Sequence, residues 1–309
     1  MKTVFLIDGG AGRIIASIPA LEKYIRLHPD EDVKILIGGW DNLVWGNSIL
    51  QNITYNMDTK GVFENAVKNA HRVIKPEPYI LPSYFNQLTS LAEAFDEEIN
   101  RTNDHSDLGA PKLHLMKAEE KMGANIVADV KAQQQKTKTI VIQPYGRSAR
   151  LDKADIIDDS SRSLEPKAYI SLVKKLAVKY NLIFFGERHM AQAEDTYTFK
   201  LESDLRGWAA VIENSDYFIG CDSVGQHMAR AFNKPGTVII GSTFAKNTTY
   251  PDFFNIFEKK DYPKVYSPIR IAGLDCNLAD RLNDRCMELD DKEINELYTM
   301  IEKDIEKKT

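Results

Sequence analysis

The sequence predicts an α/β protein with two domains, each built around a parallel sheet. Short apolar segments alternate with longer amphipathic segments along the chain, and a polar tract near residue 135 separates two such series. The 309 residues exceed the roughly 100–200 residues of an average domain. Apolar and charged residues make up 43% and 28% of the chain, as in ordinary globular proteins, which argues against disorder.

The first domain is expected to open with a β-α-β unit. Residues 4–7 form an apolar run that ends in Asp8 and two glycines, as a strand followed by a tight turn would. Apolar residues then recur at helical spacing from Ile14 to Leu27. A second apolar run at residues 33–37 supplies the next strand, so the first domain is predicted to have a parallel sheet.

We expect the domain boundary at residues 135/136. Residues 85–134 have a mostly helical pattern, and polar residues with Gly109 and Pro111 mark a loop at residues 103–111. The tract at residues 133–138 is polar and precedes a fresh apolar run. The two domains are therefore predicted to span residues 1–135 and 136–309.

The second domain repeats the alternation and gives a second Rossmann-like half. The amphipathic segment at residues 289–307 is expected to form a terminal helix that packs across both halves. The other expected elements are strands at 139–142, 182–186, 217–220 and 237–240, and helices at 166–177, 205–212 and 224–232.

Composition and charge argue against several classes of protein. The formal net charge of -5 gives no general attraction to nucleic acid, which would need a local basic patch. No segment approaches the roughly 20 apolar residues of a membrane span, and the first apolar run is too short for a signal peptide. The cysteines Cys221, Cys276 and Cys286 lack the spacing of a zinc site and are expected to be free thiols. We expect a cytoplasmic protein without integral membrane contact.

Two loops follow apolar strands where parallel sheets bind ligands, at residues 8–13 and 220–226. The second loop leads into a helix, whose first N–H groups and positive dipole end would face an anion such as a pyrophosphate. The alternative interpretation is that Asp222 or Ser223 caps the helix and His227 is a packed residue.

Residues 222–231, Asp-Ser-Val-Gly-Gln-His-Met-Ala-Arg-Ala, resemble the Asp-Thr-Gly-x-x-His-x-Ala-Ala-Ala loop of the heptosyltransferase-like glycosyltransferases of family 9. The resemblance extends to Asn233-Lys234-Pro235, Gly241-Ser242-Thr243, residues 209–216, Cys286-Met287 and the opening segment at residues 10–21. It implies the GT-B fold, with two facing Rossmann-like domains, an acceptor site in the first domain and a nucleotide-sugar site in the second. The implied reaction transfers a sugar from a nucleotide-diphosphate sugar to an acceptor hydroxyl, with inversion and without a metal.

The resemblance and the need to stabilise a departing diphosphate single out residues for the donor. Backbone N–H groups from Ser223 to Gly225 and guanidinium groups are the expected phosphate ligands. Exposed arginines are also common on protein surfaces, which is the competing interpretation for them. Glu187 resembles a family glutamate near the donor ribose. The donor-binding candidates are Arg147, Arg162, Glu187, Asp222, Ser223, Val224, Gly225 and His227, with Arg150 as a further arginine.

The sequence departs from the family in its catalytic motif. The position of the family's catalytic aspartate is occupied by Arg13, so the general base must lie elsewhere. Asp8 and Asp41 follow the first two strands and are the candidates, with Asp8 preferred; the alternative is that Asp8 caps the turn. Arg13 is a candidate phosphate ligand at the start of a helix. The family's lysine falls on Ser163, with Arg162 adjacent.

Two other functions stay open at this stage. The loss of the motif aspartate favours a non-catalytic protein that binds a sugar nucleotide or a glycan. An NAD-dependent oxidoreductase is disfavoured, because Ile15 replaces the third glycine of the dinucleotide motif and no acidic residue directly ends the second strand. The acceptor is expected to be a saccharide or a hydroxymethylated DNA base of the phage type. The donor sugar, its nucleotide and the oligomeric state are not predicted.

Overall fold

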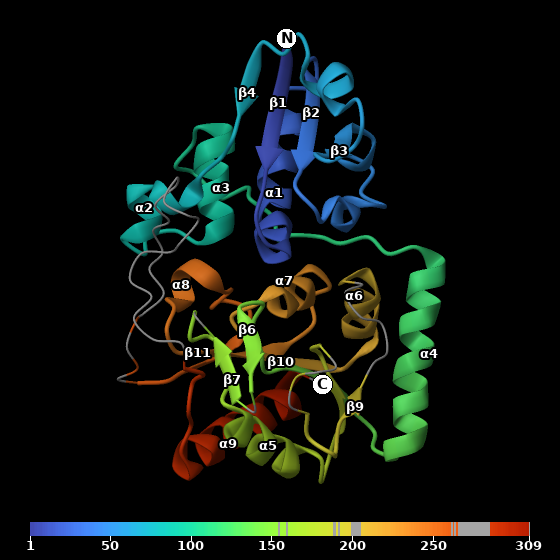
Figure 1. Cartoon of the computed structure of the whole chain (residues 1–309), viewed down its shortest axis with the longest axis vertical. Coiled ribbons are helices and arrows are strands. Elements are labelled where there is room, and N and C mark those ends of the chain that lie inside the picture. The colour runs from blue at the N-terminus through green and yellow to red at the C-terminus, as the bar shows by residue number, and fades with distance from the viewer. Residues whose placement is uncertain are drawn as a thin grey trace. The chain divides into compact units, whose positions relative to one another are not determined.

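The structure is a computed structural model, and it describes residues 1–153, 155–158, 160–187, 190, 192–198, 205–260, 262, 264 and 285–308. The chain divides into two compact units, Met1–Met116 and Lys117–Thr309 (Figure 1). Cys276 lies outside the described residues, whereas Cys221 and Cys286 are buried free thiols.

The first unit contains a four-stranded parallel sheet in the order β3-β2-β1-β4. Its two central strands pair from Lys2 with Asp32 to Ile7 with Ile37, and their apolar side chains are largely buried. All four strands therefore end at one edge of the sheet, where Asp8 follows β1. The strands are β1 (Lys2–Ile7), β2 (Asp32–Ile37), β3 (Thr54–Asn56) and β4 (Arg72–Ile74).

Helices α1 (Ala11–Leu27) and α3 (Leu91–Asn100) pack against each other in this unit. Most of α1 is buried, which agrees with the apolar spacing of its sequence. A capping box between Ser90 and Glu93 begins α3. Shorter helical segments are α2 (Pro82–Phe85), Asp41–Val44, Gln51–Ile53, Phe63–Val67 and Pro78–Ile80.

The second unit has a six-stranded parallel sheet in the order β12-β11-β10-β5-β8-β9. The register pairs Gly220 of β10 with Gln143 of β5, so the carboxyl ends of these two central strands are adjacent. A separate antiparallel hairpin joins β6 (Ala149–Asp152) to β7 (Asp155–Asp158). The sheet strands are β5 (Thr139–Gln143), β8 (Asn181–Phe184), β9 (Tyr197–Thr198), β10 (Tyr217–Cys221), β11 (Gly236–Ile240) and β12 (Asn255–Glu258).

Helix α4 (Lys117–Gln134) belongs to the second unit, so the division between the units precedes the expected boundary at 135/136. It packs closely on α6 (Leu205–Asn214). A Cβ added to Gly123 would lie 2.3 Å from the Ala210 carbonyl oxygen, so only glycine allows this approach. Two hydrogen bonds of 2.6 Å join the Arg206 guanidinium to the Glu119 carboxylate. These contacts join residues that are distant in sequence, so no local pattern places α4 in the second unit.

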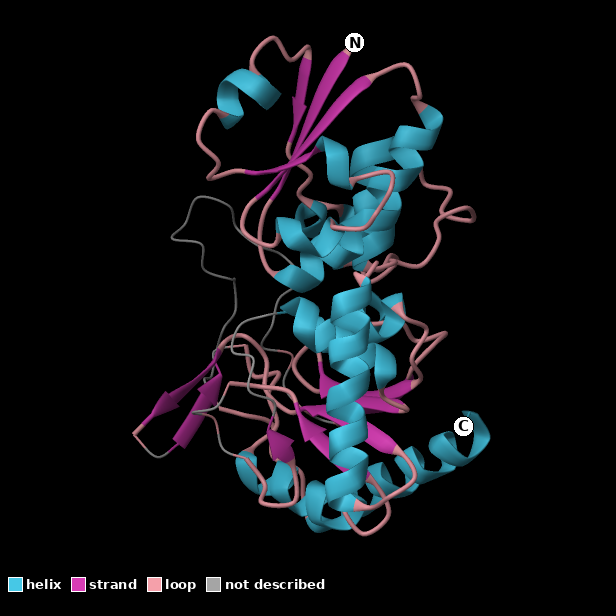
Figure 2. Ribbon diagram, turned by 90° about the vertical axis from the view of Figure 1, so that its right-hand side faces the viewer, coloured by secondary structure: helices cyan, strands magenta, loops and turns pink. Residues whose placement is uncertain are grey.

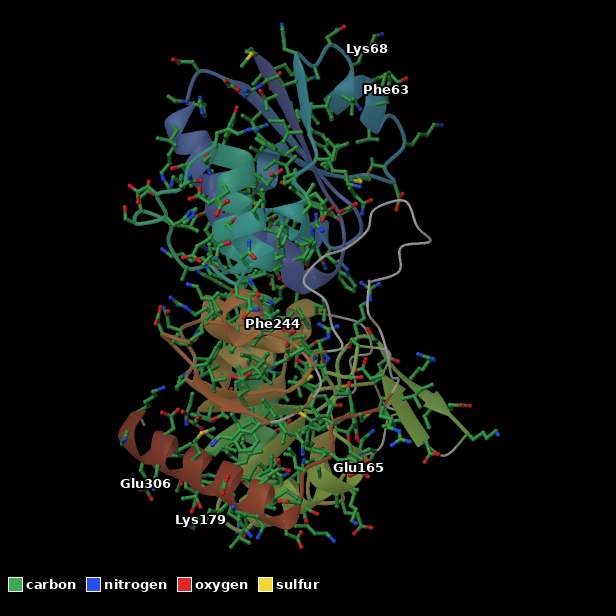
Figure 3. The ribbon with its side chains drawn as sticks, turned by 90° about the vertical axis from the view of Figure 1, so that its left-hand side faces the viewer. Phe63, Lys68, Glu165, Lys179, Phe244 and Glu306 are labelled. Carbon is green, nitrogen blue, oxygen red and sulfur yellow. The ribbon has the colours of Figure 1, made fainter. Side chains whose placement is uncertain are left out.

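The terminal helix α9 (Asp291–Lys308) contacts α5 (Pro166–Leu176), β11 and β12, all within the second unit (Figure 2). The buried Tyr217 hydroxyl donates to Asp304 Oδ2 at 2.6 Å and so ties α9 to the sheet. Lys179, which is labelled in Figure 3, forms a 2.7 Å ion pair with Glu302 of α9. Packing of α9 across both domains stays a prediction.

Candidate functional site

The carboxyl edge of the second sheet positions helix α7 (Val224–Ala231). Residues Asp222 and Ser223 link β10 to this helix, and Ser223 has an extended backbone as the N-cap residue. Its side chain makes no capping hydrogen bond, so the capping interpretation of Ser223 is wrong. The first turn of α7 begins at the strand edge, where its positive dipole end is the end that an anion site requires, although the Gln143 side chain takes up the Gly225 N–H that the sequence assigns to the donor phosphate.

Gln143 at the end of β5 supports this turn and was missed by the sequence analysis. Its Oε1 accepts a 2.9 Å hydrogen bond from the Gly225 N–H, and its Nε2 donates to Ser223 Oγ at 3.2 Å. A Cβ added to Gly225 would lie 2.4 Å from Gln143 Oε1. This close approach explains why glycine stands at position 225, one residue later than in the family motif.

A second support is Asp158, whose fully buried carboxylate organises the segment 160–163. Its Oδ1 accepts from Ser160 N at 2.9 Å and from Ser160 Oγ at 2.6 Å. Its Oδ2 accepts from Arg162 N at 3.2 Å, Ser163 N at 2.9 Å and Ser163 Oγ at 2.5 Å. Burial raises the pKa of Asp158, but the Arg162 charge and the serine hydroxyls outweigh burial and lower it overall. Asp158 is therefore ionised, and its hydrogen bonds fix the conformation of residues 160–163.

Arg162 is brought to the start of α7 by that segment. Its Nε donates to Ser160 Oγ at 2.8 Å, and its Nη1 donates to the Asp222 carbonyl oxygen at 3.1 Å. The same Nη1 lies 3.8 Å from Asp222 Oδ2, and the Arg162 side chain is 18% exposed. A partly exposed guanidinium thus stands beside the first turn of α7, which is the pairing expected of a phosphate site.

Asp222 is almost completely buried behind this turn. Its Oδ1 accepts a 2.8 Å hydrogen bond from Gln226 Nε2, which also donates to the Thr248 carbonyl at 2.9 Å. Burial raises the pKa of Asp222, although Arg162 and the hydroxyls of Thr243 and Thr248 oppose the shift. The contacts indicate that Asp222 orients the loop from inside the protein.

His227 lies one turn along α7 and is 7% exposed. Its Nδ1 is 2.8 Å from the Tyr250 hydroxyl, and the two rings meet edge to face at 5.5 Å. Tyr250 follows α8 (Ala245–Thr248), whose N-cap residue Phe244 is labelled in Figure 3. Burial, with a smaller contribution from Arg162, lowers the pKa of His227 to about 4. His227 is accordingly neutral at neutral pH.

The remaining donor candidates lie around the same sheet edge but are more exposed. Arg147 follows β5 by way of the buried Gly146, whose N–H donates to Ser163 Oγ at 2.9 Å. Glu187 is exposed and follows β8, the strand that pairs with β5. Arg150 is exposed on the β6–β7 hairpin. Hydrogen bonds thus connect the segment of Arg162, Ser223 and Gly225. The residues Arg147, Arg150 and Glu187 are exposed and lie outside this connected set.

In the first unit, Asp8 stands at the carboxyl end of β1 with its side chain 40% exposed. Its Oδ2 is 2.8 Å from Lys75 Nζ, and its Oδ1 is 3.5 Å from Arg13 Nη2. Partial burial raises the pKa of Asp8, but the Lys75 hydrogen bond and the Arg13 charge lower it overall. The carboxylate is therefore accessible and ionised, and Lys75, which follows β4, is a partner that the sequence analysis missed.

Arg13 is buried beneath this edge, with 5% exposure. Its Nη2 donates to the Pro76 carbonyl at 2.8 Å and its Nη1 to Glu77 Oε1 at 3.1 Å. The guanidinium carbon also lies 5.0 Å and 5.4 Å from the ring centroids of Tyr79 and Phe95. The hydrogen bonds join the start of α1 to the segment that follows β4; a phosphate contact by Arg13 stays a prediction.

Asp41 begins the short helix that follows β2, at the same sheet edge as Asp8. Its Oδ1 accepts a 2.7 Å hydrogen bond from Asn56 Nδ2 at the end of β3. The two candidate bases are thus placed by neighbouring parallel strands, as the sequence predicts, and their catalytic roles stay predictions.

The fold is shared with solved glycosyltransferases. ADP-heptose LPS heptosyltransferase II of Escherichia coli matches with a TM-score of 0.64 and 13% identity over 99% of each chain. A family 9 glycosyltransferase from Veillonella parvula gives 0.62 and 13% over 84% of this chain and 86% of that one. The iron-containing dodecameric glycosyltransferase TibC of enterotoxigenic E. coli gives 0.60 and 9% over 99% of this chain and 76% of that one.

No model of a known protein family matches the chain, and a comparison with curated protein sequences finds no match. The structural likenesses confirm the predicted α/β class with two Rossmann-like units and the resemblance to heptosyltransferases at the level of the GT-B fold.

The described part of the chain shows neither a metal cluster nor a membrane-spanning helix. There, no group of three or more His, Cys, Asp and Glu residues is placed to hold a metal ion. Across the same residues, no helix combines the length and the apolar character that a bilayer span needs. Metal independence stays a prediction.

Proposed function

We propose that this chain is a nucleotide-sugar-dependent glycosyltransferase whose second unit binds the donor diphosphate. The observation that carries the proposal is the first turn of α7, where the Ser223 side chain makes no capping hydrogen bond, beside the Arg162 guanidinium at the carboxyl edge of a parallel sheet. Backbone N–H groups and a guanidinium are the groups that bind a diphosphate, and they also stabilise the negative charge that develops when it leaves. The likeness in fold to heptosyltransferases supports the same assignment.

The first unit is proposed to bind the acceptor and to supply the base. Asp8 is accessible at the carboxyl edge and can accept the proton of an acceptor hydroxyl as that oxygen attacks the anomeric carbon. Attack opposite to the leaving diphosphate gives inversion, and Arg162 takes the place that a metal would otherwise have, so we propose a metal-independent reaction. Asp41 is a second carboxylate at this edge for orienting acceptor hydroxyls.

The acceptor is proposed to be a saccharide, with a hydroxymethylated DNA base as the alternative. DNA binding would depend steeply on salt concentration because phosphate contacts release counterions, whereas binding of a neutral saccharide would not. A cytoplasmic location accompanies this proposal, because Cys221 and Cys286 are free thiols.

The experiment is a thermal-stability and calorimetric screen of nucleoside diphosphates and nucleotide sugars, followed by an assay for nucleoside diphosphate release with candidate acceptors. ADP is the first probe, because TibC, a protein of similar fold, has been solved in complex with ADP-D-beta-D-heptose. We expect Arg162→Gln to weaken ADP binding about 10- to 100-fold, as the loss of a hydrogen bond to a charged group does. The matched control is Arg26→Gln on the exposed part of α1, which should bind normally. Absence of binding by every nucleotide would refute the proposal.

A second candidate is a non-catalytic sugar-nucleotide or glycan-binding protein. The observation that favours it is the double ion pairing of Asp8 by Lys75 and Arg13, which lowers its pKa and makes it a weaker base. Nucleotide binding without nucleoside diphosphate release, over a panel of saccharides and hydroxymethylated DNA, would favour this candidate over the enzyme.

A further inference from the structure

His227 and Tyr250 form a hydrogen-bonded pair near the first turn of α7. Ser223 and His227 are four residues apart, so they share one face of the helix and His227 stands directly behind the N-cap residue. The 2.8 Å distance joins His227 Nδ1 to the phenolic oxygen of Tyr250. The pair therefore fixes how the imidazole is presented next to the proposed diphosphate site.

The direction of this hydrogen bond follows from the donors that must be satisfied. Among the described residues, His227 Nδ1 is the one hydrogen-bond partner of the Tyr250 hydroxyl. If Nδ1 carried a proton and donated it, the phenolic proton would lose its one acceptor among the described residues. Burial also raises the pKa of Tyr250, so the phenol keeps its proton. Tyr250 is therefore the donor and Nδ1 the acceptor.

The charge state of the ring follows from its surroundings. Arg162 is the charged group among the described residues that acts on the His227 ring, and Arg230 lies 6.0 Å from the centre of the Tyr250 ring. Burial and the Arg162 charge both disfavour a proton on Nδ1 in addition to one on Nε2. A neutral imidazole whose Nδ1 accepts a hydrogen bond carries its single proton on Nε2.

We propose that Tyr250 is a positioning residue that holds His227 as the neutral Nε2–H tautomer, so that His227 offers the donor diphosphate one N–H group and no positive charge. This inference rests on the proposed function for its ligand, and on the 2.8 Å contact for its tautomer. Arg162 then supplies the positive charge of the site, and His227 supplies one directed hydrogen bond to the diphosphate. Nε2 makes no hydrogen bond to the described part of the chain.

The test is nitrogen-15 NMR of protein labelled in the imidazole rings, at neutral pH without ligand. The His227 signals are identified by their loss in His227→Gln. We expect Nε2 to be protonated and Nδ1 unprotonated in the wild type, and both tautomers to be populated in Tyr250→Phe. A wild-type His227 with the proton on Nδ1, or an unchanged tautomer in Tyr250→Phe, would overturn the assignment. If Tyr250→Phe does not fold, the wild-type spectrum alone decides.

Calorimetry with ADP tests the consequence for the ligand. We expect Tyr250→Phe to bind ADP about five- to tenfold more weakly than the wild type, as the loss of one well-directed hydrogen bond would cause. Tyr55→Phe in the first unit is the matched control and should bind normally. A wild type with the Nε2–H tautomer that binds no nucleoside diphosphate overturns the proposed function, whereas a wild type that binds ADP with the Nδ1–H tautomer overturns only this inference.

Discussion

Replacing Asp158 with Asn tests how the donor site is built. The amide nitrogen of Asn cannot accept, so in either orientation at least one backbone N–H, that of Ser160 or those of Arg162 and Ser163, loses its acceptor. The other hydrogen bonds lose the help of the negative charge, which is about half of their strength. Together these losses destabilise the second unit by about 3 kcal/mol. For a unit of this size the melting temperature should fall by about 6–12 °C.

The assay is thermal unfolding of Asp158→Asn beside Asp152→Asn, which makes the same chemical change at an exposed position of the neighbouring hairpin. Asp152→Asn should unfold like the wild type. Because Asp158 also holds Arg162 in place, Asp158→Asn should bind ADP at least about fivefold more weakly at temperatures where it remains folded. Equal melting temperatures for the two variants would refute the assignment of Asp158 as the residue that organises segment 160–163.

Three further predictions concern His227 and the edge of the first sheet. The unfolding free energy should fall by up to about 3 kcal/mol as the pH is lowered from 6.5 to 4, because His227 binds a proton in the unfolded chain but not in the folded one. Urea denaturation of His227→Gln should lack this component of the pH dependence. Arg13→Ala should lower the unfolding free energy by about 3 kcal/mol, because a buried cation and its hydrogen bonds are lost, whereas Arg26→Ala at an exposed position should lower it little. Similar values for the two variants would contradict a stabilising role of the buried Arg13 hydrogen bonds. Lys75→Met should raise the pKa of Asp8, measured by carboxyl NMR titration, and an unchanged titration would argue against the Lys75 contact.

Most sheet strands and helices could be predicted from periodicity, because each buries a regular apolar face. The expected helix at 224–232 is observed at Val224–Ala231, and the expected strand at 217–220 at Tyr217–Cys221. Strands β4 and β12 were not predicted, since each has only a few apolar residues and remains partly exposed at a sheet edge. The hairpin β6–β7 was not predicted because its charged and apolar residues do not alternate regularly.

The candidate site could be predicted where a residue lies in a continuous motif, and not where a distant contact positions it. Ser223 and Gly225 stand in the loop that resembles the family motif. Gln143 and Asp158 act on that loop from other strands, and no local pattern marks a glutamine or an aspartate for such a task. Arg13 is a second example: its place in the motif suggests a phosphate ligand, which stays a prediction, whereas its contacts with Glu77 and the Pro76 carbonyl come from distant residues that no local pattern marks.

The most direct test of the central claim is calorimetric titration of the wild type and Arg162→Gln with a panel of nucleoside diphosphates. The account predicts that at least one nucleoside diphosphate binds the wild type and that the same compound binds Arg162→Gln about 10- to 100-fold more weakly. Failure of every nucleoside diphosphate to bind, or equal binding to both proteins, would contradict a donor site at the start of α7 beside Arg162.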